Sequence, residues 1–373
     1  MYWHLLMTEK CNSQCRYCYE KSMKEFDNGL GEKFKFEFDV PCMSEVDSKK
    51  LKKFISQDKD AVIIFYGGEP LLNIPKIIEI MDELGNSVKY CMQTNGKLLN
   101  EFPSEYMNRL SRILVSIDGD KKRTDFNRGE GNYDKVIENI KFIKNNGYKG
   151  EIVARMTIDQ DFPDLFEQVQ NILELKLFDS IHWQLDVGFY KNDFEEEKMK
   201  SFFEKYNASV KKLVGFWVEE VSTARCTPNC GVLGQTGNLL KLYPFFGIAN
   251  RLLGRDKETR IQCGAGYAGY AITTNGKIAA CPILNNIKDF YCGDLDSKKL
   301  KEIKIEECSD CEVKNICGGR CLYWRKAKLW PEVGDKMVCD SIKFLIKEIR
   351  EILPYLENVE LEYEMYFGPE IIP

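Results

Sequence analysis

Apolar and polar positions along the first 215 residues alternate in blocks that predict strands and helices in turn. Tyr2–Met7 is a short apolar run suited to a buried strand, and Ala61–Tyr66 is apolar until it ends at two glycines. Later runs predict four more strands, at Lys89–Thr94, Ile113–Ile117, Glu151–Thr157 and Ile181–Leu185. Regular strand–helix alternation of this kind predicts a parallel sheet with right-handed crossovers.

Segments with helical periodicity lie between these strands. Ser44–Ser56 has its apolar residues on one side, and Ser44 with Asp47 is similar to a capping box. The other helices are predicted at Pro75–Gly85, Pro103–Leu110, Tyr133–Asn146, Asp164–Leu175 and Glu196–Leu213. Six strand–helix units are too few for a closed eight-stranded barrel, so we expect an α/β fold that is either an open partial barrel or a doubly wound sheet.

The character of the chain changes near residue 225, where helical periodicity fades and glycines become frequent. Ten of the fifteen cysteines lie between Cys226 and Cys339, which indicates a separate cysteine-rich domain. The expected parts are a partial barrel over residues 1–215, a bridging segment over 216–260, and a cysteine-rich domain over 261–373 with a helix at Ser341–Ile352.

Composition narrows the chemistry. With 44% hydrophobic residues, the 373-residue chain can bury a large core. Its net charge of -5 argues against a dedicated nucleic-acid binder, and it lacks both a membrane-length apolar run and a signal peptide. Fifteen cysteines beside two histidines favour iron–sulfur clusters over disulfides or zinc. We expect a cytoplasmic protein with no nucleic-acid or membrane partner.

A cysteine triplet follows the first predicted strand. Cys11, Cys15 and Cys18 have the spacing C-x3-C-x2-C, so three thiolates lie on one short loop. Three thiolates can hold three irons of a cubane and leave the fourth iron open for a small chelating molecule. An open position of this kind is typical of catalytic metal sites. A zinc knuckle or a chance grouping of thiols is the alternative.

Three further polar, glycine-containing segments follow predicted strands: GGEP at 67–70, QTNG at 93–96 and SIDG at 116–119. Because parallel strands end at one edge of a sheet, we expect these loops to converge with the triplet. Adjacent glycines let the backbone approach a ligand closely, although an ordinary strand-to-helix turn is the alternative. Arg128, in FNRGEG, is a candidate for binding a carboxylate, with an exposed arginine as the alternative.

Together these motifs resemble the radical S-adenosylmethionine (radical SAM) superfamily over residues 1–215. The resemblance implies that the triplet holds a [4Fe–4S] cluster whose open iron is chelated by the methionine amino and carboxylate groups of SAM. One electron then cleaves SAM to a 5′-deoxyadenosyl radical and methionine. The residues implied in cofactor binding are Tyr17 near the adenine, Gly67, Gly68 and Glu69 near the amino group, Asn95 and Ser116 near the methionyl and ribose parts, Asp118 and Arg128.

A second cysteine set resembles the SPASM extension of radical SAM enzymes. Its pattern is C-x(9–15)-G-x4-C, then C-x2-C-x5-C-x3-C, then a final cysteine, with Gly276 as the spaced glycine. The resemblance implies two auxiliary [4Fe–4S] clusters, hence three clusters in all. One would take Cys263, Cys281 and Cys321, and the other Cys308, Cys311, Cys317 and Cys339. A zinc ribbon is the alternative.

The eighth auxiliary ligand is not evident from the pattern. Cys226 or Cys230 is the favoured candidate, with Cys292 or an open iron as alternatives. Cys42 and Cys91 are expected to be buried structural thiols, because a lone cysteine behaves as a small hydrophobe.

The SPASM resemblance implies action on a peptide or protein, with a crosslink, thioether or epimer as the product. A sulfatase maturase, which forms formylglycine, is the enzyme alternative; an electron carrier and a tRNA-acting enzyme fit the loops and the charge less well. In such maturases a carboxylate directly after the G-x4-C cysteine acts as general base, whereas Pro282 follows Cys281 here. Asn285 and Asn286 are not basic, and Asp289 would need a loop rearrangement, so we expect no formylglycine formation.

Further partners follow from this hypothesis. A radical SAM enzyme needs one electron, so a flavodoxin or a ferredoxin is the expected donor. Because the chain begins at its first predicted strand, we expect that a separate leader-peptide-binding protein presents the substrate or that the enzyme reads the substrate directly.

Overall fold

The computed structural model describes residues 1–19, 29–188, 193–225, 241–255, 261–304, 308 and 310–356. Internal contacts divide the chain into two compact units. Unit 1 consists of Met1–Ile117, Thr124–Val153 and Gly264–Ile305, and unit 2 of Asp118–Arg123, Ala154–Cys263 and Glu306–Pro373. Each unit therefore combines segments from both halves of the sequence, and the division into three consecutive domains stays a prediction.

Parallel strands form the base of unit 1. They are β1 (Tyr2–Leu6), β2 (Val62–Tyr66), β3 (Lys89–Thr94) and β4 (Leu110–Ser116). Each pairs with the next in parallel, and β5 (Glu151–Ile158) and β6 (Ser180–Leu185) continue the same order. A doubly wound sheet reverses its strand order part-way, whereas here the order follows the chain without reversal. The prediction of a partial barrel of six strand–helix units is therefore confirmed.

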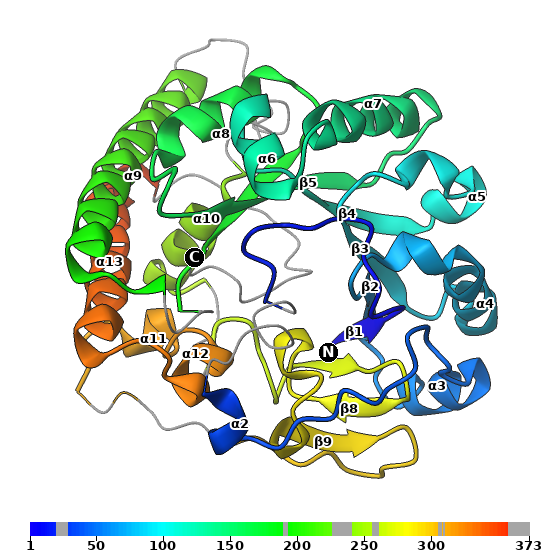
Figure 1. Cartoon of the computed structure of the whole chain (residues 1–373). Coiled ribbons are helices and arrows are strands. Elements are labelled where there is room, and N and C mark those ends of the chain that lie inside the picture. The colour runs from blue at the N-terminus through cyan, green and yellow to red at the C-terminus, as the bar shows by residue number, and fades with distance from the viewer. Residues whose placement is uncertain are drawn as a thin grey trace. The chain divides into compact units, whose positions relative to one another are not determined.

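The helices that follow the first strands pack on the outer side of β1 to β4 (Figure 1). In unit 1 they are α3 (Ser48–Ile55), α4 (Ile74–Leu84), α5 (Ser104–Met107) and α7 (Asn132–Asn145). The ring of Trp3 on β1 contacts Phe54 of α3 edge-on, with 5.1 Å between centroids. The N-cap of α3 is Asp47, whose carboxylate accepts from two backbone N–H groups, so this helix begins later than predicted from Ser44.

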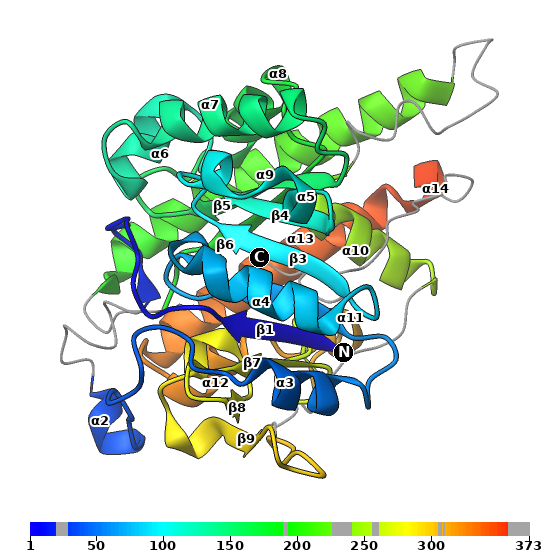
Figure 2. The same cartoon turned by 90° about the vertical axis from the view of Figure 1, so that its right-hand side faces the viewer.

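Three strands from the cysteine-rich half also belong to unit 1. They are β7 (Gly269–Ile272), β8 (Lys277–Ala279) and β9 (Tyr291–Asp294). β7 pairs in parallel with β1, and β8 and β9 follow in antiparallel order, as Figure 2 shows beside β1. Gly276, the spaced glycine of the second motif, has φ +81° in the turn between β7 and β8, a conformation that favours glycine.

Unit 2 is mainly helical. Its longer helices are α8 (Leu165–Glu174), α9 (Glu196–Arg225), α10 (Tyr243–Leu252) and α13 (Glu332–Glu351). α9 packs against α8 and α13, and the buried rings of Trp183 and Trp217 each lie 5.4 Å from Phe245 of α10. Among the residues that the structure describes, the remaining helices are α2 (Leu30–Lys33), α6 (Lys121–Arg128), α11 (Lys314–Cys317), α12 (Leu322–Ala327), α14 (Leu353–Leu356), and the 3-10 helices Pro70–Asn73, Leu99–Glu101, Pro282–Leu284 and Lys288–Phe290.

Several helices differ from the sequence prediction, among them α9, which extends to Arg225 beyond the predicted end at Leu213. α6 was not predicted because it is almost wholly polar, and α10 because it is buried on nearly every side; neither has an apolar stripe. α13 begins at Glu332, nine residues before the predicted start, and its first turn carries acidic side chains that stabilise a helix N-terminus. In the described parts of the chain, no helix is both long enough and apolar enough to cross a membrane.

Candidate active site

The loops after β1 and β2 are joined through their backbones in unit 1. The loop after β1 carries the cysteine triplet, Cys11–Cys18. Gly68 N donates to Thr8 O at 2.9 Å, and Glu69 N donates to Lys10 O at 2.9 Å. These bonds continue the pairing of β1 and β2 past the strand ends, so the cysteine loop leaves the sheet from a fixed edge.

Two glycines make this approach possible. A Cβ atom on Gly67, whose φ is +128°, would lie 2.4 Å from Thr8 O. A Cβ atom on Gly68 would lie 2.3 Å from Lys10 O. Any other residue would therefore push the two loops apart. The sequence predicted a close approach of these glycines to a ligand; the structure shows a close approach to the cysteine loop itself.

Glu69 is fully buried and organises the loop after β3. Its Oε1 accepts from Thr94 Oγ1 at 2.7 Å and from Leu71 N at 3.1 Å, and its Oε2 accepts from Asn95 N at 2.8 Å. Burial raises the pKa of this carboxyl to about 7, although the three hydrogen bonds oppose the rise. Glu69 thus fixes the backbone of the QTNG segment through its buried carboxylate.

The loop after β3 contacts the cysteine loop in turn. Asn95 Nδ2 donates to Asn12 Oδ1 at 2.7 Å and lies 3.8 Å from Cys11 Sγ. Lys97 Nζ donates to Asn12 O at 2.7 Å. The GGEP and QTNG segments therefore converge on the triplet, as the sequence predicted.

Arg128 also reaches the cysteine loop. Its side chain is buried, and its guanidinium lies 5.3 Å from the ring centre of Tyr17. Next to it, Arg16 N donates to Asn127 O at 2.9 Å, and the Arg16 guanidinium lies over Phe126 at 4.0 Å. The alternative that Arg128 is an exposed surface arginine is wrong, because the end of α6 packs on this loop.

The SIDG segment follows β4. Ser116 is the last residue of that strand and is half-buried. Asp118 belongs to unit 2, where it is fully buried and accepts from Thr157 N at 2.9 Å. This bond lies within unit 2, and the role of Asp118 in shaping the site stays a prediction.

The thiols of the triplet lie close to one another. Packing around the sulfur of Cys11 raises the pKa of this thiol to about 11, although the residue keeps exposed surface. The charges of Glu69, Cys15 and Cys18 add to the rise, so these groups are within electrostatic reach of Cys11. Burial disfavours the thiolate of Cys11 in the absence of a metal and a bound metal would stabilise it, which fits the donor set of an iron–sulfur cluster.

A second group of thiols forms in unit 2. Cys317 ends α11 and Cys339 lies on α13. Burial raises the pKa of both thiols; Cys339 adds to the rise at Cys317, and Cys308 and Cys311 add to the rise at Cys339. The charge of Cys339 thus reaches Cys317, and those of Cys308 and Cys311 reach Cys339, whereas the assignment of all four to one cluster stays a prediction.

In the part of the chain that the structure describes, neither cysteine group is arranged to bind a single metal ion. Among the described residues, no three His, Cys, Asp or Glu side chains converge as ligands of a single metal ion. A [4Fe–4S] cluster is ligated at four separate irons, so its thiolates do not meet at one point.

The remaining ligand candidates are not brought together within one unit. Cys263 and Cys321 belong to unit 2, whereas Cys281, two residues after the end of β8, belongs to unit 1. Their assignment to one cluster stays a prediction. Cys226 and Cys230 lie outside the described residues.

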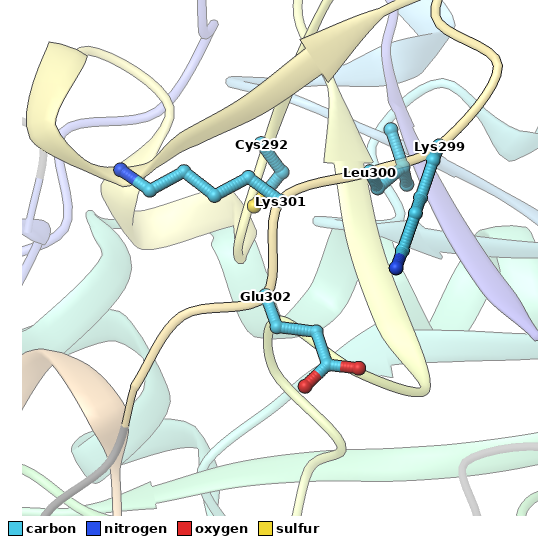
Figure 3. Close-up of a pocket in the computed structure, with 5 residues that line it drawn as sticks. All are labelled: Cys292, Lys299, Leu300, Lys301 and Glu302. Atoms are coloured by element: carbon cyan, nitrogen blue, oxygen red, sulfur yellow. The ribbon is translucent and has the colours of Figure 1, made fainter.

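Cys292 lies on β9 and is buried. Its thiol donates to Phe290 O at 3.6 Å, and burial raises its pKa to about 11. It lines a pocket of about 550 Å³ together with Lys299, Leu300, Lys301 and Glu302. The charged ends of these side chains point in different directions in Figure 3, so they do not converge on one ligand. A ligand role for Cys292 stays a prediction.

The two lone cysteines differ. Cys91 is buried on β3, as predicted. Cys42 is exposed, so the prediction of a buried thiol is wrong there. The carbonyl of Cys42 accepts from Thr8 Oγ1 at 2.7 Å and from Glu9 N at 2.9 Å, so backbone pairing holds this segment beside the cysteine loop.

Sequence reasoning missed one acidic side chain near the G-x4-C motif. Asn285 and Asn286, which follow Cys281, donate to the two carboxylate oxygens of Glu9 at 3.3 and 3.4 Å. Asp289, by contrast, is exposed and accepts from Lys35 N at 2.7 Å. The loop after Cys281 therefore lies beside a carboxylate from the opposite end of the chain.

The cysteine triplet and its supporting loops lie within a segment whose sequence matches a known protein superfamily. Residues 5–175, from β1 to the end of α8, match the radical SAM superfamily. Residues 5–175 are a radical SAM domain. Members of this superfamily are enzymes that use a [4Fe–4S] cluster and SAM, so the predicted radical SAM domain and its enzymatic character are confirmed for these residues.

Similar proteins extend the likeness beyond this domain. The radical SAM cyclopropyl synthase TigE of Paramaledivibacter caminithermalis is 24% identical, over 93% of this chain and 73% of TigE. The structure of anSMEcpe with bound AdoMet is 19% identical with a TM-score of 0.70, over 96% of this chain and 99% of that one. SuiB of Streptococcus suis, bound to the precursor peptide SuiA, is 15% identical with a TM-score of 0.52, over 86% and 71%. The fold is thus shared across the cysteine-rich half.

Proposed function

We propose that this radical SAM enzyme cleaves SAM reductively and uses the resulting 5′-deoxyadenosyl radical to modify a peptide or protein. The observation that carries the proposal is the convergence of the loops after β1, β2 and β3, in which Gly68, Glu69 and Asn95 hold the cysteine triplet in place. Radical chemistry belongs to the cofactor, while the protein supplies position and exclusion of water.

The roles of the site residues follow from their positions. Cys11, Cys15 and Cys18 hold the SAM-binding cluster, and the backbone of Gly67 and Gly68 contacts the SAM amino group. Glu69 acts through Asn95. Asn95 lies beside the cluster, and Asn95 and Ser116 are near the methionyl and ribose parts of SAM. Tyr17, supported by the Arg128 guanidinium 5.3 Å from its ring, packs at the adenine. Asp118 shapes the edge of the pocket.

The C-terminal cysteines bind two auxiliary [4Fe–4S] clusters. Cys308, Cys311, Cys317 and Cys339 hold one, supported by the charge effect of Cys339 on the pKa of Cys317 and of Cys308 and Cys311 on the pKa of Cys339. Cys263, Cys281 and Cys321 hold the other, with Cys226, Cys230, Cys292 or an open iron completing it. Thiolates from separate helices and loops are the usual ligands of such clusters.

The substrate class rests on the similar proteins. SuiB has been solved with its precursor peptide and anSMEcpe with the Cp18Cys peptide, so a peptide is the substrate favoured here. A crosslink, a thioether or an epimer is the expected product. A flavodoxin or ferredoxin supplies the electron in the cytoplasm, and a separate protein presents the leader peptide where one is needed.

The test is release of 5′-deoxyadenosine by the anaerobically reconstituted chain with SAM and dithionite. We expect slow release alone and faster release with a Cys-, Ser- or Thr-containing peptide encoded beside the gene, together with a mass change in that peptide. A chain that contains its clusters and binds SAM but never cleaves it under reduction would instead be an electron carrier.

Formylglycine formation is a second candidate, and Glu9 is the observation that favours it. Pro282 removes the base expected directly after Cys281, but Asn285 and Asn286 hold the Glu9 carboxylate at the same loop. We expect no formylglycine when a sulfatase-motif peptide is incubated with SAM and reductant. Loss of two hydrogens at its serine by the wild type, abolished in Glu9→Gln, would replace the first candidate with the second.

A further inference from the structure

The turn after Cys317 is built to donate hydrogen bonds to its sulfur. Gly318, Gly319 and Arg320 have φ values of +65°, +93° and +67°. The left-handed region is unfavourable for an arginine, so this turn is held by its surroundings. In it the backbone N–H groups of Gly319 and Arg320 donate to the Cys317 thiol.

A guanidinium contacts a second thiol of the same group. Arg325 Nη1 donates to Cys308 Sγ at 3.4 Å and lies 3.4 Å from Gly319 O. A Cβ atom on residue 319 would lie 2.3 Å from that nitrogen, so glycine leaves the space that Arg325 occupies. Arg325 is therefore placed against the thiol group by the same turn that serves Cys317.

A second arginine is locked beside the other two thiols. Arg320 Nη2 lies 2.5 Å from Asp335 Oδ1, which also accepts from Trp324 Nε1, and the Arg320 guanidinium lies 5.2 Å from the Trp324 ring centre. The charge of Arg320 acts on both Cys317 and Cys339. The negative charge of the Asp335 carboxylate offsets part of the positive charge of Arg320, but the guanidinium stays within reach of the thiols.

These contacts have one shared physical effect on a cluster. A [4Fe–4S] cluster with four thiolates is an anion whose negative charge grows by one when it is reduced. Positive charge and donors at the sulfurs stabilise the more negative state, so they raise the reduction potential. By contrast, neutral groups donate to Cys11 in the triplet, Ser13 N at 3.4 Å and Asn95 Nδ2 at 3.8 Å.

We propose that Arg325 and Arg320 are positioning residues that raise the reduction potential of the cluster held by Cys308, Cys311, Cys317 and Cys339. The inference rests on the proposed function, because it requires that these four cysteines hold a cluster.

The test is a potentiometric titration of the reconstituted full-length protein, followed by electron paramagnetic resonance. Arg325→Met removes the charge and the donor, so we expect the midpoint potential of the cluster to become more negative. The shift should be at least about 59 mV, which for one electron is a tenfold change in the ratio of oxidised to reduced cluster at a given potential. Arg325→Lys keeps the charge and should shift the midpoint less. Arg350→Met, an exposed arginine of α13, is the matched control and should leave it unchanged.

Iron content separates the possible failures. If the wild type holds no iron at these four cysteines, the proposed auxiliary cluster is wrong. If the cluster is present and its midpoint in Arg325→Met equals that of the wild type, the inference about the arginines is overturned. If Arg325→Met does not retain the cluster, Arg325→Gln decides, with a more negative midpoint in support and an unchanged midpoint against.

Discussion

The cysteine triplet and the C-terminal group of four cysteines present their thiols in different ways. At the triplet, neighbouring loops hold the chain through backbone bonds and amides, and the Cys11 residue keeps exposed surface. In the C-terminal group, Cys317 is buried and a charged arginine donates to the Cys308 thiol, whereas neutral groups, Ser13 N and Asn95 Nδ2, donate to Cys11. Open coordination suits a site that binds a substrate, and a closed set of four ligands suits a site that only transfers electrons.

Removal of the triplet is the change with the largest expected effect. Cys11→Ala, Cys15→Ala and Cys18→Ala together should remove about four irons and reduce 5′-deoxyadenosine release to background, because SAM loses its iron. Iron analysis and chromatography of the products are the measurements. Cys42→Ala, an exposed thiol outside both groups, is the control. SAM cleavage at the wild-type rate by the triple variant would contradict the assignment.

Removal of the C-terminal thiols should separate cleavage from product formation. Cys308→Ala with Cys317→Ala should again lose about four irons, since two of the four thiolates of one cluster are missing. Release of 5′-deoxyadenosine without peptide should stay within about twofold of the wild type, while the modified peptide disappears from the mass spectrum. Equal product yields in variant and wild type would show that this group has no part in the reaction.

Substitution of Asn95 tests how the loop that carries the triplet is held in place. Asn95→Ala removes the 2.7 Å bond to Asn12 Oδ1, and we expect about tenfold slower SAM cleavage with unchanged iron content, the cost of one lost buried hydrogen bond. Asn146→Ala, an exposed asparagine at the end of α7, is the matched control for the rate. A variant that cleaves SAM as fast as this control would show that Asn95 does not position the loop.

Glu69 gives the smallest expected effect, through the pH dependence of stability. Because its folded pKa is raised from 4.5 to about 7, the folded state keeps a proton that the unfolded state has lost. The free energy of unfolding should therefore fall by about 1.4 kcal/mol per pH unit as the pH rises between these values. Urea unfolding of wild type and Glu69→Gln measures it. The difference between them should change with pH only in this window; a constant difference would contradict the raised pKa.

The local features of the fold could be read from the sequence. Apolar runs predicted all six strands of the partial barrel, because each buried parallel strand is apolar by itself. The four-residue strand β7 was not predicted. Its partner β1 lies more than 260 residues away, so the local pattern of apolar residues gives no sign of the pairing. α6 and α10 were missed for the lack of an apolar stripe.

At the candidate site, too, the local motifs could be predicted from the sequence and the long-range contacts could not. The cysteines and the glycines were visible as motifs, but the reason for Gly67 and Gly68, the backbone of Thr8 and Lys10, became visible only in the fold. Glu9 was missed because 276 residues separate it from Asn285. The left-handed turn at Arg320 was missed because arginine gives no local signal for that conformation.

The central claim is that one cysteine group binds SAM and the other does not. Electron paramagnetic resonance of the reduced protein, with and without SAM, tests it most directly. The account predicts about 12 irons per chain, with SAM changing only the signal that is lost in the triple alanine variant of Cys11, Cys15 and Cys18. A change on SAM addition that persists in that variant, or zinc in place of iron at the C-terminal cysteines, would contradict it.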